Sequence, residues 1–255
     1  MNSLLTVENL NVIYGKGKDS VHAVKDVSFH IKAGEIFGLV GESGCGKSSL
    51  GKTIIRINTP SSGSIDFKGV DVASLSGKAL KTYRQEVQMV FQDPYGSLNP
   101  RMKVGHAIID VLNVHKIGAG KEERRERVVE LFESVGLDPE WAWRYPHEFS
   151  GGQRQRICIA RALSLNPDLL VADEPVSALD VSVQAEILQL LEELRIKRNL
   201  AFLFVSHDLA VVRNVCDRVA VMFNGEIVEM GDVEAVIDNP KHDYTRKLLS
   251  AVPTF

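Results

Sequence analysis

The stretch from Gly41 to Ser48 constrains this chain more than any other, because it fits the pattern G-x-x-x-x-G-K-[ST]. An apolar run at 36–40 precedes it, and a helical pattern at 49–55 follows it. Strand, glycine-rich loop and helix in that order are typical of a phosphate-binding loop. Glycines let successive backbone N–H groups turn toward an anion, and the helix N-terminus adds unpaired N–H groups and a positive dipole end. We therefore predict a nucleotide phosphate site, against the alternative of a turn that binds nothing.

Each polar residue of this loop has an expected role. Lys47 places a charge near the β- and γ-phosphates, and Ser48 supplies a hydroxyl for Mg²⁺. Cys45 is interpreted as a small loop residue and not as a catalytic thiol. The residues predicted to contact the nucleotide in this segment are Gly41, Ser43, Gly44, Cys45, Gly46, Lys47, Ser48 and Ser49.

Composition excludes several other classes of protein. At 255 residues the chain can bury one sizeable core, and a net charge of −3 gives no basic field for nucleic acid. Its three cysteines match neither a metal spacing nor a disulfide framework, which favours a reducing compartment. The N-terminus has no signal-peptide pattern, and no apolar run reaches the roughly 18 to 20 residues of a membrane span. We expect any membrane span to come from other chains.

Hydrophobic patterning predicts alternating strands and helices. A helical pattern runs from 104 to about 135, and the amphipathic pattern from Val183 to Leu194 predicts another helix. Asn224-Gly225 predicts a hairpin turn. The sequence therefore predicts a mainly parallel sheet, with an antiparallel β layer in the first quarter and a mostly helical insertion at about 94–163. The predicted strands are 5–14, 21–31, 36–40, 64–69, 85–91, 169–172, 201–205, 219–223 and 226–230.

Two carboxylates follow a buried strand at 169–172. Ligands of open α/β sheets bind at the carboxyl ends of the strands, beside the phosphate loop. Asp173 is suited to hold Mg²⁺ together with Ser48, and Glu174 can orient and deprotonate a water for attack on the γ-phosphate. The alternative, two acids that cap the next helix, fits an isolated Asp-Glu better than a pair in this position.

Two further polar residues come at predicted strand ends. His207 follows the strand at 201–205, and we interpret it as a γ-phosphate contact and not a nucleophile, although a lone histidine is more often structural. Gln92 follows the strand at 85–91, where a neutral amide can sense Mg²⁺ or the attacking water.

Ser150-Gly151-Gly152-Gln153 is a second glycine-rich helix start, and hence a second candidate anion site. The first loop already accounts for one nucleotide's phosphates. The second site is therefore expected to serve a nucleotide held by another copy or a partner. The alternative is a flexible turn with Ser150 as a helix N-cap.

Together these motifs resemble, in order and spacing, those of an ATP-binding subunit of the ABC transporter family, over nearly the whole chain. The resemblance implies an α/β fold with a RecA-like P-loop core, an antiparallel β subdomain and a helical subdomain. It implies that Tyr14 stacks on adenine, although an aromatic at a strand end is often simple packing. The other implied roles are the Q-loop glutamine for Gln92, the signature for Ser150–Gln153, the D-loop aspartate for Asp180, the catalytic carboxylate for Glu174 and the switch histidine for His207.

Two loop segments and the C-terminus resemble the oligopeptide/dipeptide branch of that family, which includes nickel importers. The similar segments are 91–101, 148–157 and 239–253, with Asp243 where the branch usually has proline and Phe149 where the family more often has leucine. Many members of the branch continue into a cysteine-bearing extension that can hold an iron–sulfur cluster. This chain has no such cysteines, so we expect no cluster. We expect the chain to be either a short member of the branch or a shortened form of a longer protein.

The resemblance implies an ATPase that uses ATP and Mg²⁺ at the cytoplasmic face of the cell membrane. Expected partners are a second nucleotide-binding subunit, identical or related, two membrane-spanning permease subunits and, indirectly, an extracytoplasmic substrate-binding protein, with no nucleic acid. Nickel, glutathione and oligosaccharide importers share this subunit type, and a soluble ABC ATPase acting on DNA or ribosomes is a further alternative. We expect one nucleotide-binding domain, 1–255, with an α/β core and β subdomain at about 1–93 and 164–230, a helical subdomain at about 94–163 and a tail at about 231–255.

Overall fold

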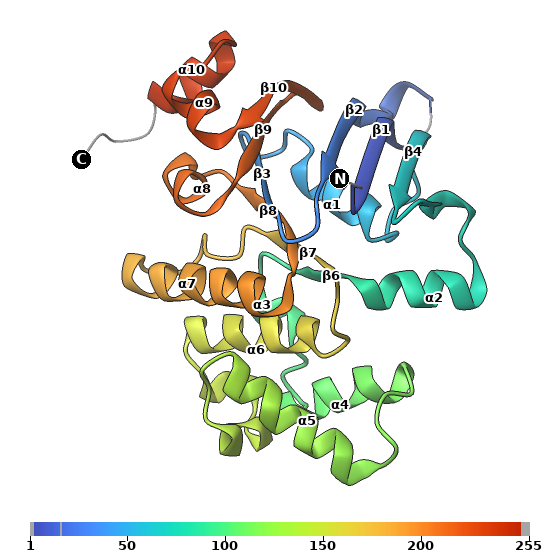
Figure 1. Cartoon of the computed structure of the whole chain (residues 1–255), viewed down its shortest axis with the longest axis vertical. Helices are drawn as coiled ribbons and strands as arrows, with labels where there is room; N and C mark the ends of the chain where they lie inside the picture. Colours follow the sequence, from blue (N-terminus) through green and yellow to red (C-terminus); the bar gives the residue numbers. More distant parts are fainter. Residues whose placement is uncertain (1–2, 16, 251–255) are drawn as a thin grey trace.

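Two β-sheets form the centre of the computed structural model, which describes residues 3–15 and 17–250 (Figure 1). The predicted loop at 15–20 includes Lys16, and the predicted tail includes 251–255; these residues lie outside the described ranges. The smaller sheet is antiparallel, with the order β2-β1-β4-β5. Its strands are β1 (Leu5–Tyr14), β2 (Val21–Ile31), β4 (Ser62–Phe67) and β5 (Val70–Asp71).

The larger sheet has the order β10-β9-β3-β8-β7-β6. Its neighbouring strands are parallel except at the β9–β10 hairpin, which turns at the predicted Asn224-Gly225. The mainly parallel sheet and the separate antiparallel layer confirm the expected fold class. The strands are β3 (Ile36–Val40), β6 (Val87–Val90), β7 (Leu169–Asp173), β8 (Ala201–Ser206), β9 (Arg218–Phe223) and β10 (Glu226–Asp232).

Helices cover the large sheet and extend from it. The α-helices are α1 (Lys47–Ile54), α2 (Gly77–Glu86), α3 (Pro94–Ser97), α4 (Val104–Val114), α5 (Lys121–Ser134), α6 (Gly151–Leu163), α7 (Val181–Arg198), α8 (Leu209–Val215), α9 (Val233–Asp238) and α10 (Asp243–Ser250). The short 3₁₀ helices are η1 (Gly17–Asp19), η2 (Val72–Ser74), η3 (Pro139–Trp143) and η4 (Pro146–Glu148). None of the helices in the described ranges is long and apolar enough to cross a membrane.

The large sheet is buried on both faces because alternate residues of its strands enter different cores. In β8, Phe202 and Phe204 pack with the helices α6, α7 and α8, whereas Leu203 and Val205 pack with α1 and the antiparallel sheet. A sheet covered on both sides needs strands that are apolar throughout, as β8 is. This packing leaves one sheet edge, where the parallel strands end, for polar groups.

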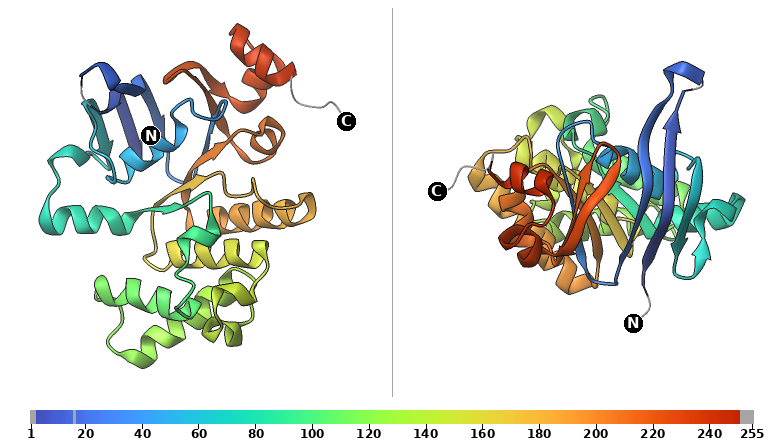
Figure 2. Two further views of the ribbon diagram at one scale, coloured as in Figure 1. Left: turned by 180° about the vertical axis from the view of Figure 1, so that it is seen from behind. Right: turned by 90° about the horizontal axis from the view of Figure 1, so that it is seen from above.

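The predicted helical insertion contains α3 to α6. α4 and α5 lie at the end of the molecule remote from the antiparallel sheet and the C-terminal helices (Figure 2). The predicted helical pattern at 104–135 forms two helices, which separate near Gly118, where φ is +80°.

Several predicted strand boundaries differ from the structure by up to two residues: the strand expected at 64–69 is Ser62–Phe67, and the one expected at 226–230 ends at Asp232. The strand expected at 85–91 begins at Val87, because α2 continues through Gln85 and Glu86. The pattern did not predict α2, since Tyr83 is the single buried residue of that helix and supplies no apolar periodicity.

Candidate nucleotide-binding site

The glycine-rich loop connects β3 to α1, as predicted. β3 ends at Val40, and α1 begins at Lys47 with Gly46 as its N-cap at φ +113°. A side chain on Gly46 would meet the carbonyl oxygen of Ala23 at 2.2 Å, so the loop needs glycine there for space as well as for backbone conformation. No side chain caps α1, and its first N–H groups stay available to an anion.

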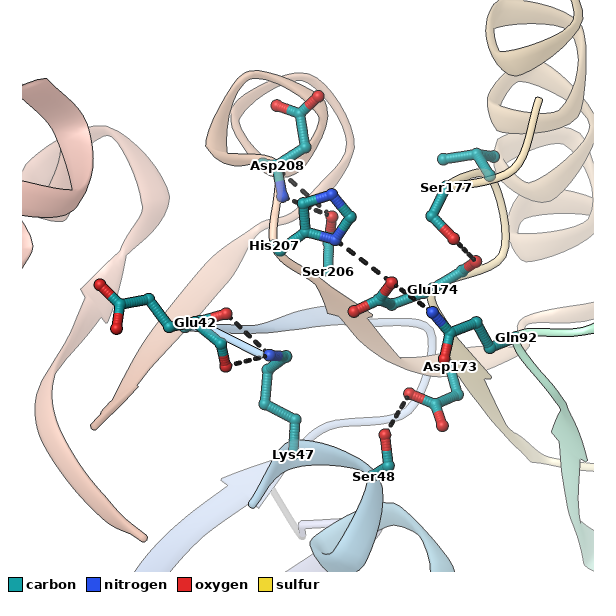
Figure 3. A network of polar contacts seen from close by, with 12 residues as sticks. Glu42, Lys47, Ser48, Gln92, Asp173, Glu174, Ser177, Ser206, His207 and Asp208 are labelled. Atoms are coloured by element: carbon teal, nitrogen blue, oxygen red, sulfur yellow. Dashed lines mark hydrogen bonds and ion pairs between the residues drawn. The ribbon is translucent and has the colours of Figure 1, made fainter. Parts of the chain in front are cut away.

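Lys47 is buried and lies across its own loop. Its Nζ donates hydrogen bonds to the carbonyl oxygens of Gly41, at 2.7 Å, and Glu42, at 2.9 Å (Figure 3). Cys45 is buried beside this ammonium group, with 3.8 Å between Sγ and Nζ. Burial raises the pKa of the Cys45 thiol, although the neighbouring charge of Lys47 opposes that shift.

The polar residues at three strand ends converge on one carboxylate. Glu174 Oε2 accepts a hydrogen bond from Nε2 of Gln92 at 2.8 Å and lies 3.2 Å from Nδ1 of His207 (Figure 3). Glu174 itself adopts φ +47°, an uncommon backbone conformation for a residue with a side chain. Its N–H donates to Val205 O at 2.9 Å, so the neighbouring strand holds this conformation. Strained residues of this kind concentrate at functional sites.

Asp173 lies one residue earlier, at the end of β7, and is 4% exposed. Its Oδ1 accepts a hydrogen bond from Ser48 Oγ at 3.1 Å. Burial raises the pKa of Asp173, the hydroxyl of Ser48 lowers it, and the charge of Glu174 raises it further. Ser48, Asp173 and Gln92, the three predicted metal-site residues, line one cavity of about 430 Å³.

A larger cavity of about 560 Å³ joins the loop to the carboxylate site. Tyr14 lines this cavity with 38% of its surface exposed, and its hydroxyl accepts a hydrogen bond from Asn58 at 2.7 Å. The lining residues that the sequence predicted are Tyr14, Ser43, Gly44, Cys45, Gly46, Lys47, Ser48, Ser49, Gln92 and Glu174. Gly41 does not line the cavity, and a Cβ on it would meet Met222 O at 2.2 Å.

A second wall of this cavity was not predicted from the sequence. It consists of β2 residues and the β9–β10 turn, and its members are Val21, His22, Ala23, Lys25, Asn224 and Gly225. The turn contacts the loop directly, because Gly225 N donates to Cys45 O at 3.0 Å. No local pattern marks these residues as site residues, since the packing of the hairpin against β2 brings them to the loop.

The second glycine motif and Asp180 do not line the cavity. Ser150 and Gln153 form a reciprocal cap at the start of α6. Gln153 N–H donates to Ser150 Oγ at 3.3 Å, and Ser150 N–H donates to Gln153 Oε1 at 2.9 Å. Gly152 has no room for a side chain, because a Cβ would lie 2.4 Å from Val183. Asp180 caps α7 through Val183 N at 3.1 Å, and this backbone hydrogen bond lowers the pKa of the Asp180 carboxyl.

A phosphate-binding loop beside a carboxylate pair on a parallel sheet defines a P-loop nucleotide-binding protein. The ABC transporter family model matches residues 24–177, and the model for the oligopeptide/dipeptide transporter C-terminal region matches residues 228–255. This chain belongs to the ABC transporter family.

Transport ATP-binding proteins are similar to this chain over most of its length. It is 56% identical over 234 residues to the oligopeptide transport ATP-binding protein AppF of Bacillus subtilis, covering 91% of this chain and 71% of that protein. It is 53% identical over 241 residues to the glutathione import ATP-binding protein GsiA of Salmonella paratyphi A, covering 94% of this chain but spanning 38% of GsiA. A solved dimeric ATP-binding cassette in a post-hydrolysis state, bound to ADP and Pi, superposes with a TM-score of 0.80 at 29% identity, covering 90% of this chain and 98% of the other.

Proposed function

We propose that this chain is the ATP-hydrolysing subunit of an ABC importer, which drives uptake of oligopeptides or dipeptides through separate permease subunits. The observation that carries the ATPase proposal is the convergence of Gln92 and His207 on Glu174, beside the cavity that the loop shares with Glu174. The C-terminal family match at 228–255 and the similarity to AppF support peptides as the substrate class.

The proposed chemistry begins with Lys47. Its Nζ donates two of its three N–H groups to backbone carbonyls of the loop and offers the third to the charged phosphates of ATP. Glu174 accepts a proton from the water that attacks the γ-phosphorus, which releases ADP and phosphate. Gln92 and His207 contact the same Glu174 oxygen and orient that carboxylate.

The residues around Ser48 fit a magnesium ion. A hydroxyl, a carboxylate and an amide oxygen are hard oxygen donors, and Mg²⁺ prefers such ligands beside phosphates. Ser48, Asp173 and Gln92 would hold the ion, as their shared cavity allows. When bound, Mg²⁺ would neutralise charge on the phosphate oxygens.

A second nucleotide-binding subunit, identical or related, is proposed to complete each site. Ser150–Gln153 lies at a helix N-terminus and does not line this chain's own cavity, which supports a role toward the nucleotide of a facing subunit. The similar solved cassette is dimeric. We place the pair at the cytoplasmic face of the membrane, with two permease subunits and an extracytoplasmic binding protein as further partners.

The proposed division of the chain follows the helices. In this proposal 94–163 is the helical subdomain that contacts the permease, and 231–255 is a tail on the α/β core.

Glutathione is the second candidate substrate, because GsiA is a glutathione import protein. Uptake of labelled peptide and of glutathione into vesicles that contain the assembled transporter distinguishes the two candidates.

Glu174→Gln tests the enzyme proposal. The amide cannot accept the proton, so turnover should fall about 10²- to 10⁴-fold. ATP binding should persist, and the dimer should last longer. The matched control is Glu193→Gln, the same change at an exposed position on α7, which should keep wild-type turnover. Phosphate release and size-exclusion chromatography with ATP measure both effects, and near-normal turnover in Glu174→Gln would remove Glu174 as the base.

A further inference from the structure

Tyr244 connects the C-terminal segment to the phosphate-binding loop. Its hydroxyl accepts a hydrogen bond from Glu42 N–H at 3.0 Å, across 202 positions of sequence. Tyr244 lies in α10, is 7% exposed, and packs against Phe223 of β9 with 4.2 Å between ring centroids. Nothing in the proposed chemistry uses this contact.

The peptide group that Tyr244 contacts also holds Lys47. Gly41 C=O and Glu42 N–H are the two ends of one planar peptide unit. The carbonyl accepts from Lys47 Nζ at 2.7 Å, and the N–H donates to Tyr244 Oη. The orientation of this peptide therefore depends on Tyr244 at one end and determines a partner of Lys47 at the other.

The segment just before Tyr244 is fastened to β10. Glu229 of β10 accepts hydrogen bonds from the N–H groups of Lys241, at 2.8 Å, and His242, at 3.0 Å, just before α10. Burial raises the pKa of the Tyr244 hydroxyl. The contact is thus a fixed support of the loop and not a loose tail touching it.

We propose that Tyr244 is a positioning residue for ATP binding, which fixes the Gly41–Glu42 peptide so that Lys47 is oriented toward the phosphate site. The C-terminal segment then contributes to nucleotide affinity without touching the nucleotide. The inference rests on the proposed ATP site, and wild-type protein that fails to bind ATP would overturn that site instead.

Tyr244→Phe in the full chain tests the proposal, because it removes one hydroxyl and keeps the ring against Phe223. The dissociation constant for Mg-ATP, measured by calorimetry, should rise about 2- to 10-fold, the equivalent of one neutral hydrogen bond. Turnover at saturating ATP should stay within about 2-fold, since the groups at Glu174 are unchanged. The Glu42 amide should also exchange with deuterium faster than in the wild type.

Tyr83→Phe is the matched control. Tyr83 is 3% exposed, and its hydroxyl donates to Ile54 O at the far end of α1. Its loss should lower Tm and leave ATP affinity unchanged. Wild-type ATP affinity in Tyr244→Phe, or an equal loss of affinity in Tyr83→Phe, would overturn the proposal. Deuterium exchange of the wild-type protein gives a further check. A Glu42 amide that is unprotected from exchange in the wild type would also overturn the proposal.

Discussion

Gly46 and Gly44 offer a matched pair of substitutions in one loop. Both have positive φ, +113° and +82°, so alanine at either position costs about 1–2 kcal/mol of backbone strain. Their surroundings differ. A Cβ on Gly44 meets nothing within 4 Å, whereas a Cβ on Gly46 would lie 2.2 Å from Ala23 O and 2.8 Å from the Met222 methyl group.

The clash at Gly46 cannot be relieved by a side-chain rotation, because Ala23 O is backbone in β2. Overpacking of this kind adds about 1–3 kcal/mol. The total expected for Gly46→Ala is therefore about 2–5 kcal/mol, against about 1–2 kcal/mol for Gly44→Ala. The cost appears as lower unfolding free energy when the loop keeps its conformation, or as weaker ATP binding when the loop relaxes.

Urea denaturation and ATP titration of both variants measure the two components. We expect the summed loss for Gly46→Ala to exceed that for Gly44→Ala by at least about 1 kcal/mol, which is about fivefold if it falls on affinity. Equal losses, or a larger loss at Gly44, would refute the steric argument and show that backbone conformation alone makes glycine necessary.

Three other predictions concern the same site. Lys47→Ala should lose ATP affinity in a binding titration, because the phosphates lose their one buried ammonium partner among the described lining residues; unchanged affinity would contradict its role. Ser150→Arg should abolish turnover while each monomer still binds ATP, and retained turnover would argue against completion of the site by a second subunit. Maleimide labelling of Cys45 should be slow at pH 7 and accelerate as pH rises, because burial raises the thiol pKa, and ATP should slow it at every pH because Cys45 lines the cavity; equal rates with and without ATP would exclude that placement.

The motif-bearing half of the site could be predicted from the sequence because it is built from local patterns. An apolar strand followed at once by Asp173-Glu174, or by Ser206-His207, is a pattern of only a few residues, and it indicates that these polar residues lie at the edge of the sheet. Parallel strands then bring such ends together whatever the intervening sequence, so Gln92 and His207 meet Glu174.

The other half could not be predicted because it depends on packing between separate units. His22 and Lys25 lie in the antiparallel sheet, and Asn224 lies in a turn whose sequence signals only a hairpin. Tyr244 resembles an ordinary aromatic of an amphipathic helix, and its contact with Glu42 crosses 202 positions. Hydrophobic periodicity describes neighbouring residues and does not predict contacts between residues so far apart in the sequence.

The place of β3 in the large sheet has a consequence for synthesis of the protein. β3 carries the phosphate-binding loop, and both of its neighbours, β8 and β9, come from residues 201–223. A nascent chain that has emerged to residue 200 therefore contains the loop but neither strand beside it, and Glu174 N lacks its partner Val205. Translation order therefore leaves the loop of such a fragment without either neighbouring strand, and we expect the cavity beside the loop to form only after residues 201–223 have emerged.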